Sequence, residues 1–347
     1  MAITAEQTKQ LAAECGFELA GIAVALPHAD FTRFEEWRTR DFAGEMGYLT
    51  DHRGDLRNDP RNLLAEAKSI VCVGKLYNTP HPHTSADPDR GWISRYAWGS
   101  DYHEVMRQGL TALVERIRQV HGMPFESRMC VDTAPLLERS YARQAGLGWI
   151  GKNTCLINQQ RGSWFFLGEL LLSIPLEPDT PPPDRCGTCR RCIDACPTAA
   201  IVANGDSGWT LDSRLCISYL TIELRGPLDR EDLPETGNHI FGCDICQDVC
   251  PWNQRADVTE DPRFAPATEP LDLAVLASLS AEEFRTLFRH SPVWRAKYEG
   301  ILRNVAVAMG NSGDPKLVEP LEKLAFHPNA TIAVTAKRAL RKLRENF

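Results

Sequence analysis

The 347-residue sequence has no apolar run that approaches the length of a membrane-spanning helix. It also begins without the apolar core of a signal peptide, because MAITAEQTKQLAAECGF contains acidic and polar residues. No P-loop and no H-E-x-x-H zinc motif is present. We therefore expect a cytoplasmic monomer with no membrane partner, in a reducing compartment where twelve cysteines would not form a disulfide framework.

Positive charge is scarce overall, yet the last part of the chain is basic. The formal net charge is −7, whereas residues 281–347 contain twelve Lys or Arg and seven Asp or Glu. A basic tail on an acidic body is the asymmetry expected of a segment that binds a polyanion. The same residues could form the solvated face of ordinary helices. Charge alone leaves both interpretations open.

The spacing of the cysteines predicts bound iron–sulfur clusters. Seven of the twelve cysteines stand in two short runs that end in Cys-Pro. In the bacterial ferredoxin pattern, three closely spaced thiolates bind one [4Fe–4S] cluster and the fourth binds the other cluster. Two runs therefore predict two clusters and a protein that transfers single electrons. The runs are Cys186-x2-Cys189-x2-Cys192-x3-Cys196-Pro197 and Cys243-x2-Cys246-x3-Cys250-Pro251.

The second run lacks its first cysteine, because Ile240 occupies that position. Two clusters need eight thiolates, and Cys216 is the natural eighth ligand. Crossing the fourth ligands in the ferredoxin manner then gives two sets of four. These are Cys186, Cys189, Cys192 and Cys250 for the first cluster, and Cys196, Cys216, Cys243 and Cys246 for the second.

Zinc is the alternative metal that the C-x-x-C pairs could bind. A zinc site predicts two pairs separated by a long loop, whereas this chain has a contiguous three-cysteine run ending in Cys-Pro, so clusters are favoured. The other four cysteines have apolar neighbours and are expected to be buried small hydrophobic residues. They are Cys15, Cys72, Cys130 and Cys155.

Three regions differ in composition. Residues 1 to about 175 alternate helical and strand patterns, which predicts an α/β domain. Pro175–Asp184 holds five prolines in ten residues and predicts a stiff linker into the cysteine region. The tail is helical in pattern, with units of HEAT-like length. The expected helices are Thr4–Cys15, Tyr102–Val120, Ala134–Ala145, Leu271–Phe288, Ile301–Met309, Pro315–Leu324 and Thr331–Leu343; the expected strands are Ser69–Gly74 and Cys155–Ile157, and Trp164–Ile174 is a further apolar run.

A glycine-rich segment, Gly146–Gly151, matches the G-x-G-x-x-G dinucleotide fingerprint. It follows a helical pattern where the fingerprint requires a strand, so a nicotinamide site is disfavoured. The favoured interpretation is a helix C-cap and a tight turn in which the backbone approaches a ligand or another element. Lys152 and Asn153 follow directly and could hold a polar edge of a cofactor.

Asp132 follows a short apolar segment and precedes a predicted helix. It could cap that helix, which stabilises a helix by about 1 kcal/mol. It could equally be a general acid whose pKa an apolar pocket raises toward neutrality. The residues alone do not decide between the helix cap and the general acid. Nearby, Asp101-x-His103 lacks the glycine of the D-x-H-x-x-G cobalamin signature, because Met106 stands there.

The whole chain resembles the epoxyqueuosine reductases. The resemblance depends on M-C-V-D-T-A-P, G-L-G-W-I-G-K-N and G-C-D-I-C-Q-D-V-C-P-W-N, with R-x-D-P, Y-A-x-G-x-D-Y-H and I-S-Y-L-T-I-E. It implies a cytoplasmic, cobalamin-dependent iron–sulfur enzyme that reduces the epoxide of epoxyqueuosine at the tRNA wobble position to queuosine. It also implies a nitroreductase-like cobalamin-binding domain, a ferredoxin-like two-cluster domain and a helical, HEAT-like tRNA-docking region.

The resemblance also implies roles for particular residues. Asp132 matches the family's proton donor, and the eight cysteines match its cluster ligands. Segments that resemble the cobalamin pocket contain Arg57, Tyr96, Ala97, Asp132, Lys152, Asn153 and Ser218. The expected tRNA contacts, with the anticodon stem-loop as partner, are Arg225, Lys297, Arg303, Lys337, Arg338 and Arg341. A low-potential electron donor is a further expected partner.

The expected domains are residues 1–178 for cobalamin and catalysis, 179–260 for the clusters and 261–347 for tRNA docking. Two alternatives stay open at this stage. One is a corrinoid reductive dehalogenase that acts on a small molecule, and the other is a ferredoxin-type electron carrier without a substrate. A dehalogenase would not need a basic helical tail. An electron carrier would leave some 175 N-terminal residues without a function.

Overall fold

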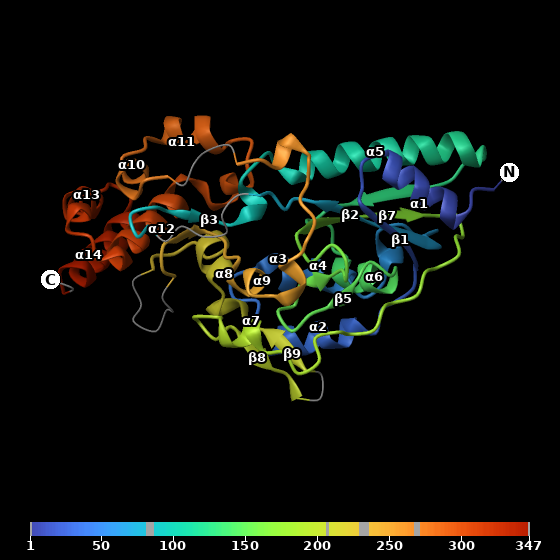
Figure 1. Cartoon of the computed structure of the whole chain (residues 1–347), viewed down its shortest axis with the longest axis horizontal. Coiled ribbons are helices and arrows are strands. Elements are labelled where there is room, and N and C mark those ends of the chain that lie inside the picture. The colour runs from blue at the N-terminus through green and yellow to red at the C-terminus, as the bar shows by residue number, and fades with distance from the viewer. Residues whose placement is uncertain (1, 81–86, 206–207, 229–235, 267–270, 346–347) are drawn as a thin grey trace.

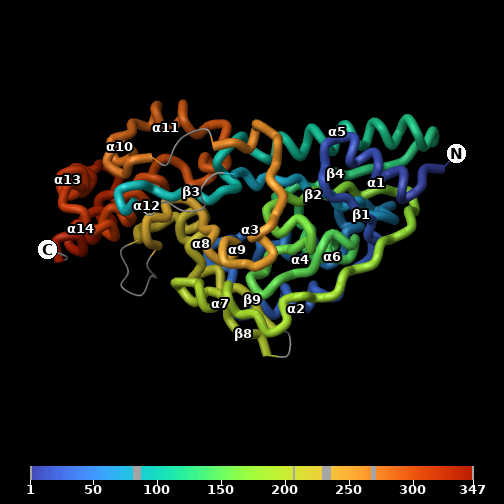
Figure 2. Tube along the Cα trace, viewed as in Figure 1, coloured from blue at the N-terminus to red at the C-terminus, as the bar shows by residue number. Residues whose placement is uncertain are grey.

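The structure is a computed structural model that describes residues 2–80, 87–205, 208–228, 236–266 and 271–345. Figures 1 and 2 show an elongated molecule with the main β-sheet toward one end, the C-terminal helices at the other, and the cysteine-bearing segments between them. None of the helices in the described ranges has both the length and the apolar character needed to cross a membrane.

A four-stranded antiparallel sheet organises the first region, in the order β1-β2-β7-β4. Its apolar residues alternate between two faces, so each face needs its own cover. Helices α1 and α5 pack on one face, and α6 packs on the other. The bounds are β1 Leu19–Val24, β2 Ser69–Leu76, β4 Ser127–Cys130, β7 Phe165–Leu172, α1 Ala5–Glu14, α5 Tyr102–His121 and α6 Glu138–Gln144.

The ends of these helices follow local chemistry. α1 begins with a capping box in which Thr4 and Gln7 bond each other's backbone N–H groups. α6 is shorter than the predicted helix Ala134–Ala145, because a turn in which the Leu136 N–H donates to the Ala134 carbonyl precedes it. Gly146, with φ +82°, ends α6 as a C-cap. The predicted turn is therefore confirmed.

The cysteine region consists of short elements that pair with the first region. Strand β10 forms a parallel pair with β3, which precedes α5 in the chain. The linker before this region is attached to the edge of the main sheet. Its Asp179 carboxylate accepts a hydrogen bond from the Ile22 N–H of β1 at 2.9 Å. The elements are β3 Trp92–Ile93, α7 Arg191–Asp194, β8 Ile201–Ala203, β9 Trp209–Leu211, α8 Ile217–Ile222, β10 His239–Phe241 and α9 Ile245–Asp248.

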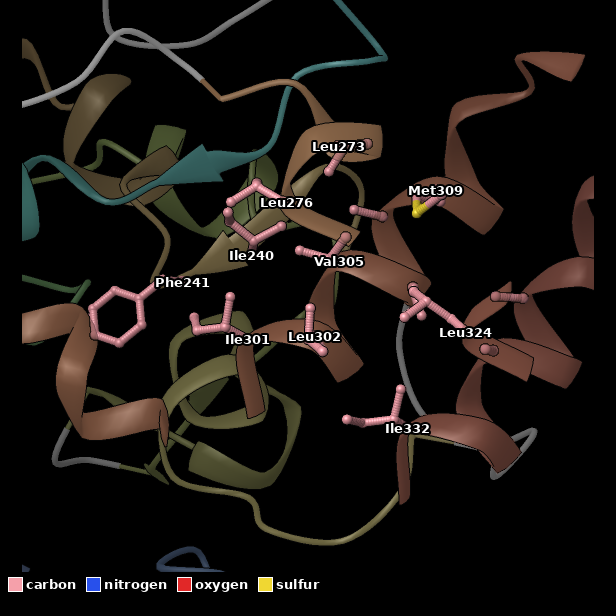
Figure 3. Packing of buried hydrophobic residues seen from close by; sticks show 14 of the residues in the cluster. Ile240, Phe241, Leu273, Leu276, Ile301, Leu302, Val305, Met309, Leu324 and Ile332 are labelled. Atoms are coloured by element: carbon pink, nitrogen blue, oxygen red, sulfur yellow. The ribbon is translucent and has the colours of Figure 1, made fainter. Parts of the chain in front are cut away.

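The C-terminal helices share one apolar core with strand β10. Figure 3 shows Ile240 beside Leu276 and Val305, and Phe241 belongs to the same buried cluster. Ile240 is fully buried, which explains why an apolar residue occupies this position where a ferredoxin run has cysteine. The helices are α10 Leu273–Ala277, α11 Ala281–Phe288, α12 Lys297–Ser312, α13 Val318–Ala325 and α14 Ala330–Glu345.

Short elements complete the first region below the sheet. Helix α2 and the segment after it lie beneath α6 and beside β9 in Figure 1. Gly148 and Gly151 lie so close to Ile157 that an added Cβ at either position would overlap it, at 2.3 Å and 2.5 Å. The close backbone approach predicted for the glycine-rich turn is thus confirmed. The bounds are α2 Asp30–Thr39, α3 Gly47–Thr50, α4 His52–Leu56, β5 Trp149–Ile150 and β6 Leu156–Ile157.

Candidate functional site

The thiols of the first predicted cluster set lie together. Burial and the neighbouring thiols of Cys186, Cys250 and Cys189 raise the pKa of Cys192 to about 11. The same four cysteines line a cavity of about 250 Å³. Cys250, distant in sequence, therefore joins the three cysteines of the first run, as the crossed arrangement requires.

The second set also lies together. Burial, Asp244, and the thiols of Cys216 and Cys196 raise the pKa of Cys243 to about 12. Cys246 faces Cys243 and Cys216 as well. The structure thus brings Cys216 to the place left open by Ile240.

A single-ion zinc site is not formed in the described ranges. Among these residues, no three His, Cys, Asp or Glu side chains are arranged to hold one metal ion.

Lys152 and Asn153, which were expected to contact cobalamin, donate hydrogen bonds to the cluster loops. The Lys152 ammonium donates to the carbonyls of Gly187 and Cys189, at 2.6 and 2.8 Å. The Asn153 amide donates to the Cys246 carbonyl at 3.3 Å. Two of the three Lys152 donors are thus committed to the first cluster loop. Sequence reasoning missed this because the loops are distant in the chain.

The four remaining cysteines divide into two kinds. Cys72 and Cys130 are buried in the sheet, as predicted. Cys15 and Cys155 are only partly buried, so the prediction is wrong for them. The Cys155 thiol lies within hydrogen-bonding range of Cys246.

A cavity of about 450 Å³ lies beneath the sheet, between α2, α6 and β9. Its wall combines aromatic rings with the cations Arg33 and Arg57. Arg57, an expected cofactor contact, is buried and donates to the Arg53 carbonyl at 2.8 Å. The aromatic residues of the wall are Phe34, Trp37, Tyr48 and Trp209.

The second cluster loop borders this cavity. Ser213 lines the cavity, and its carbonyl accepts a hydrogen bond from the Cys216 N–H at 2.9 Å. Ser218, an expected cofactor contact, lies instead beside the Cys216 thiol and donates a hydrogen bond to it. Ala97, also expected there, is 3 % exposed and packs in the core of the C-terminal helices.

Asp132 stands at the edge of the cavity in a turn with φ +53°, a left-handed conformation that aspartate tolerates better than most residues. It is not the cap of α6, because that helix begins six residues later after Leu137. Nε2 of His103 lies 3.3 Å from its Oδ2, and Nη1 of Arg295 lies 3.8 Å from the same oxygen. The capping interpretation is therefore wrong.

The pKa of Asp132 also differs from the raised value that a general acid in an apolar pocket would have. Burial acts to raise its pKa, but the hydrogen bond and charge of His103 and the charge of Arg295 lower the pKa overall. Burial lowers the pKa of His103, but its bonds to Asp101 and Asp132 raise it to about 9. At neutral pH the proton of this pair therefore resides on His103.

Sequence reasoning missed His103 and Arg295 as parts of the site. The Asp-x-His spacing is a signal that indicates the carboxylate holding His103, since Asp101 Oδ1 lies 2.7 Å from its Nδ1. Arg295 comes from the segment before α12 and gave no local signal. Tyr96, an expected contact, lies near Asp132, whose charge acts with burial to raise the pKa of Tyr96.

The expected tRNA contacts do not all reach the surface. Arg303 is 1 % exposed, and its guanidinium donates to the carbonyls of Leu220, Leu224 and Gly226. It holds the chain after α8 and cannot contact a phosphate, so this assignment is wrong. Arg338 is half-buried. The exposed members are Arg225, Lys297, Lys337 and Arg341.

Comparisons with known proteins match this architecture. Residues 57–133 match a family described as Epoxyqueuosine reductase QueG, DUF1730, and residues 185–253 match a 4Fe-4S double cluster binding domain. The epoxyqueuosine reductase of Xanthomonas campestris pv. campestris is 43% identical over 94% of this chain and 93% of its own length. The chain belongs to the epoxyqueuosine reductase family.

Other family members are similar over most of their length. The epoxyqueuosine reductase of Escherichia coli K12 is 41% identical over 93% of this chain and 86% of its own. A crystal structure of epoxyqueuosine reductase with an epoxyqueuosine-modified tRNA-Tyr stem loop has a TM-score of 0.86 at 31% identity, over 97% of this chain and 89% of that one. A Bacillus subtilis structure, with its aspartate-bearing catalytic loop swung out of the active site, also has a TM-score of 0.86, at 30% identity over 97% and 90%.

The two thiol sets predict the effect of removing one ligand. Cys216→Ala should lower the iron content of anaerobically purified protein from about eight atoms per chain to about four, because one cluster loses a ligand. Cys155→Ala is the matched control, since this thiol also lies beside Cys246 but is not assigned as a ligand. An unchanged iron content in Cys216→Ala would refute the assignment.

The His103 pair predicts a pH-dependent contribution to stability. Because folding raises the pKa of His103 from 6.5 to about 9, its stabilising effect is complete below pH 6.5 and is lost as the pH rises through 9. His103→Gln should therefore lower the thermal unfolding midpoint more at pH 6 than at pH 10. His52→Gln, at an imidazole that is 81% exposed, is the control. An equal loss at both pH values would contradict the ion pair.

Proposed function

We propose that this protein reduces the epoxide of epoxyqueuosine in tRNA to the alkene of queuosine. The reaction removes one oxygen as water and consumes two electrons and two protons. Family membership supports the substrate. The observation that carries the proposal is that Asp132 and the loop of the second cluster border the same cavity. An electron carrier without a substrate would need neither the cavity nor an acid at its edge.

The residues of the cavity suit cobalamin as the cofactor. A flat macrocycle with amide side chains fits a wall that offers aromatic faces together with cations and hydroxyl groups, and Arg57 with Phe34, Tyr48 and Ser213 would hold it. None of the described lining residues is a histidine, in agreement with the missing D-x-H-x-x-G signature. When bound, cobalamin supplies a low-potential cobalt centre that can deliver to carbon the electrons that clusters carry singly.

The acid of the reaction is the Asp132–His103 pair. The leaving oxygen is a poor alkoxide, so a positioned acid increases the rate by typically 10²–10⁴. His103 holds the proton between two carboxylates, and Asp132 reaches the cavity from its turn. When substrate fills the cavity and excludes water, the ionised form of Asp132 becomes less favourable. The proton then passes from His103 through Asp132 to the oxygen.

The exposed basic residues of the C-terminal part are the proposed contacts for the anticodon stem. Lys337 and Arg341 of α14 are exposed four residues apart, on one side of the helix, and Lys297 is exposed where α12 begins. Such cations bind phosphates without reading sequence. We further propose that residues 1–178 form a nitroreductase-like cobalamin domain, 179–260 a ferredoxin-like domain and 261–347 a HEAT-like docking domain.

The proposed function predicts a specific product and a specific loss. Wild-type protein with reductant, cobalamin and epoxyqueuosine-containing tRNA should yield a nucleoside that is lighter by one oxygen, measured by mass spectrometry. Asp132→Asn should lower the rate by about 100-fold or more, because it removes the acid. Its iron content and cobalamin absorption should be unchanged. Full activity in Asp132→Asn would show that Asp132 is not the acid of the reaction.

The docking surface predicts a local effect of charge. Reversing Lys337, Arg338 and Arg341 to Glu should weaken tRNA binding and reduce its dependence on salt. The matched control reverses three exposed residues, Arg118 of α5, Arg128 of β4 and Lys68 directly before β2. Figures 1 and 2 show these elements toward the end of the molecule opposite α14. Equal weakening by both triple variants would show that only net charge matters. No weakening by the first would leave its residues as a solvated face.

A further inference from the structure

Two glutamates, one in the sheet and one in the wall of the cavity, have no role in the chemistry proposed so far. Glu169 is in the middle of β7, where its register partners are Cys72 on β2 and Cys130 on β4. It is fully buried, and neither of its carboxylate oxygens has a well-formed hydrogen bond. An apolar residue would be the ordinary choice at such a position, because burying an isolated charge is strongly unfavourable.

Glu138 connects this buried group to the cavity. It is the first residue of α6 and lines the cavity wall, while its Oε1 atom is buried without a partner. Its carboxyl group faces that of Glu169 and also accepts a hydrogen bond from the backbone N–H of Asp132. A path of acidic groups therefore leads from the interior of the sheet through Glu138 to the turn that carries Asp132.

The surroundings of the two carboxyl groups favour the neutral form. Burial and the charge of Asp132 raise the pKa of Glu138 to about 7, although Arg139 and Arg57 act in the opposite direction. Burial and the charge of Glu138 raise the pKa of Glu169 well above its ordinary value. Adjacent carboxyl groups in one apolar site cannot both ionise readily. The other titratable groups near the pair are Cys72, Cys130 and Tyr102.

We propose that Glu138 is a proton store for the reduction, and that Glu169 is the positioning residue that maintains it. The inference rests on the proposed function, whose reaction consumes two protons while the Asp132–His103 pair holds one. Glu138 becomes a carboxylate when its proton passes to the Asp132 carboxylate, which has given its first proton to the departing oxygen; Asp132 then gives this second proton to the same oxygen, which leaves as water. Glu169 stays protonated and donates a hydrogen bond to the Glu138 carboxylate, so the buried charge is stabilised. A proton from solvent restores Glu138 through the cavity.

Substitution by glutamine separates proton storage from structure. Glu138→Gln keeps an oxygen that can accept the Asp132 N–H, so the turn is held, but it removes the ionisable proton. We expect single-turnover oxygen loss to fall by about 100-fold at pH 7. In the wild type the rate should fall as the pH rises through about 7, and this transition should be absent from Glu138→Gln. Glu138→Asp should recover part of the rate, which a role in packing alone would not explain.

Glu169→Gln is the matched control, because glutamine resembles a protonated carboxyl group in shape and remains a donor. It should keep the transition near pH 7. Infrared spectroscopy of the cofactor-free full chain should show one protonated carboxyl signal that titrates near pH 7 and is absent from Glu138→Gln. It should show a second that persists to high pH and is absent from Glu169→Gln.

The outcomes distinguish the two proposals. If wild-type protein removes no oxygen from epoxyqueuosine-containing tRNA, the proposed function fails, whatever the infrared signals show. If wild-type protein is active and Glu138→Gln keeps its rate and pH profile, the proton store is refuted and the proposed function stands. If neither infrared signal appears in the wild type, the pair is ionised and the inference is also refuted.

Discussion

The position of the cysteine loops depends on hydrogen bonds from the first region, because these loops have almost no apolar core of their own. The apolar cluster beside the first thiol set has only three buried members, Trp149, Ile157 and Cys250. Around it, Lys152 and Asn153 donate to three loop carbonyls. The Ser94 hydroxyl and the Arg95 N–H donate to the buried Asp244 carboxylate, the latter at 2.7 Å. Thiols from the two runs and Cys216 form two sets because other segments fix the backbones of their loops.

Asp132 has cations and neutral carboxyl groups in its surroundings. His103 and Arg295 favour its ionised form, whereas Glu138 and Glu169 are buried and have raised pKa values. The carboxylate thus stays ionised while its neighbours hold protons. A single carboxyl group in an apolar pocket would combine both tasks, but it could supply only one proton to a reaction that consumes two.

Most elements of the fold and both thiol sets could be predicted from the sequence, because periodicity and cysteine spacing are local signals. The failures involve contacts between distant segments. Lys152 and Arg303 looked like surface or pocket cations, yet each binds carbonyl groups in another part of the chain. Burial near Asp132 suggested a raised pKa, but the cations that reverse this come from α5 and from the segment before α12. No local pattern could show these partners.

The regions of the chain meet in one network of charged groups at Asp132. Arg295 precedes α12 and approaches Asp132, while its Nε donates to Glu223 at 2.7 Å, directly after the helix that follows Cys216. The segment before α12, the second cluster loop and the Asp132 turn therefore share one cation. A displacement of the C-terminal helices would move Arg295 and change the charge around Asp132. Because the C-terminal helices also share their core with β10, they support the candidate site directly as well as carrying the proposed docking surface.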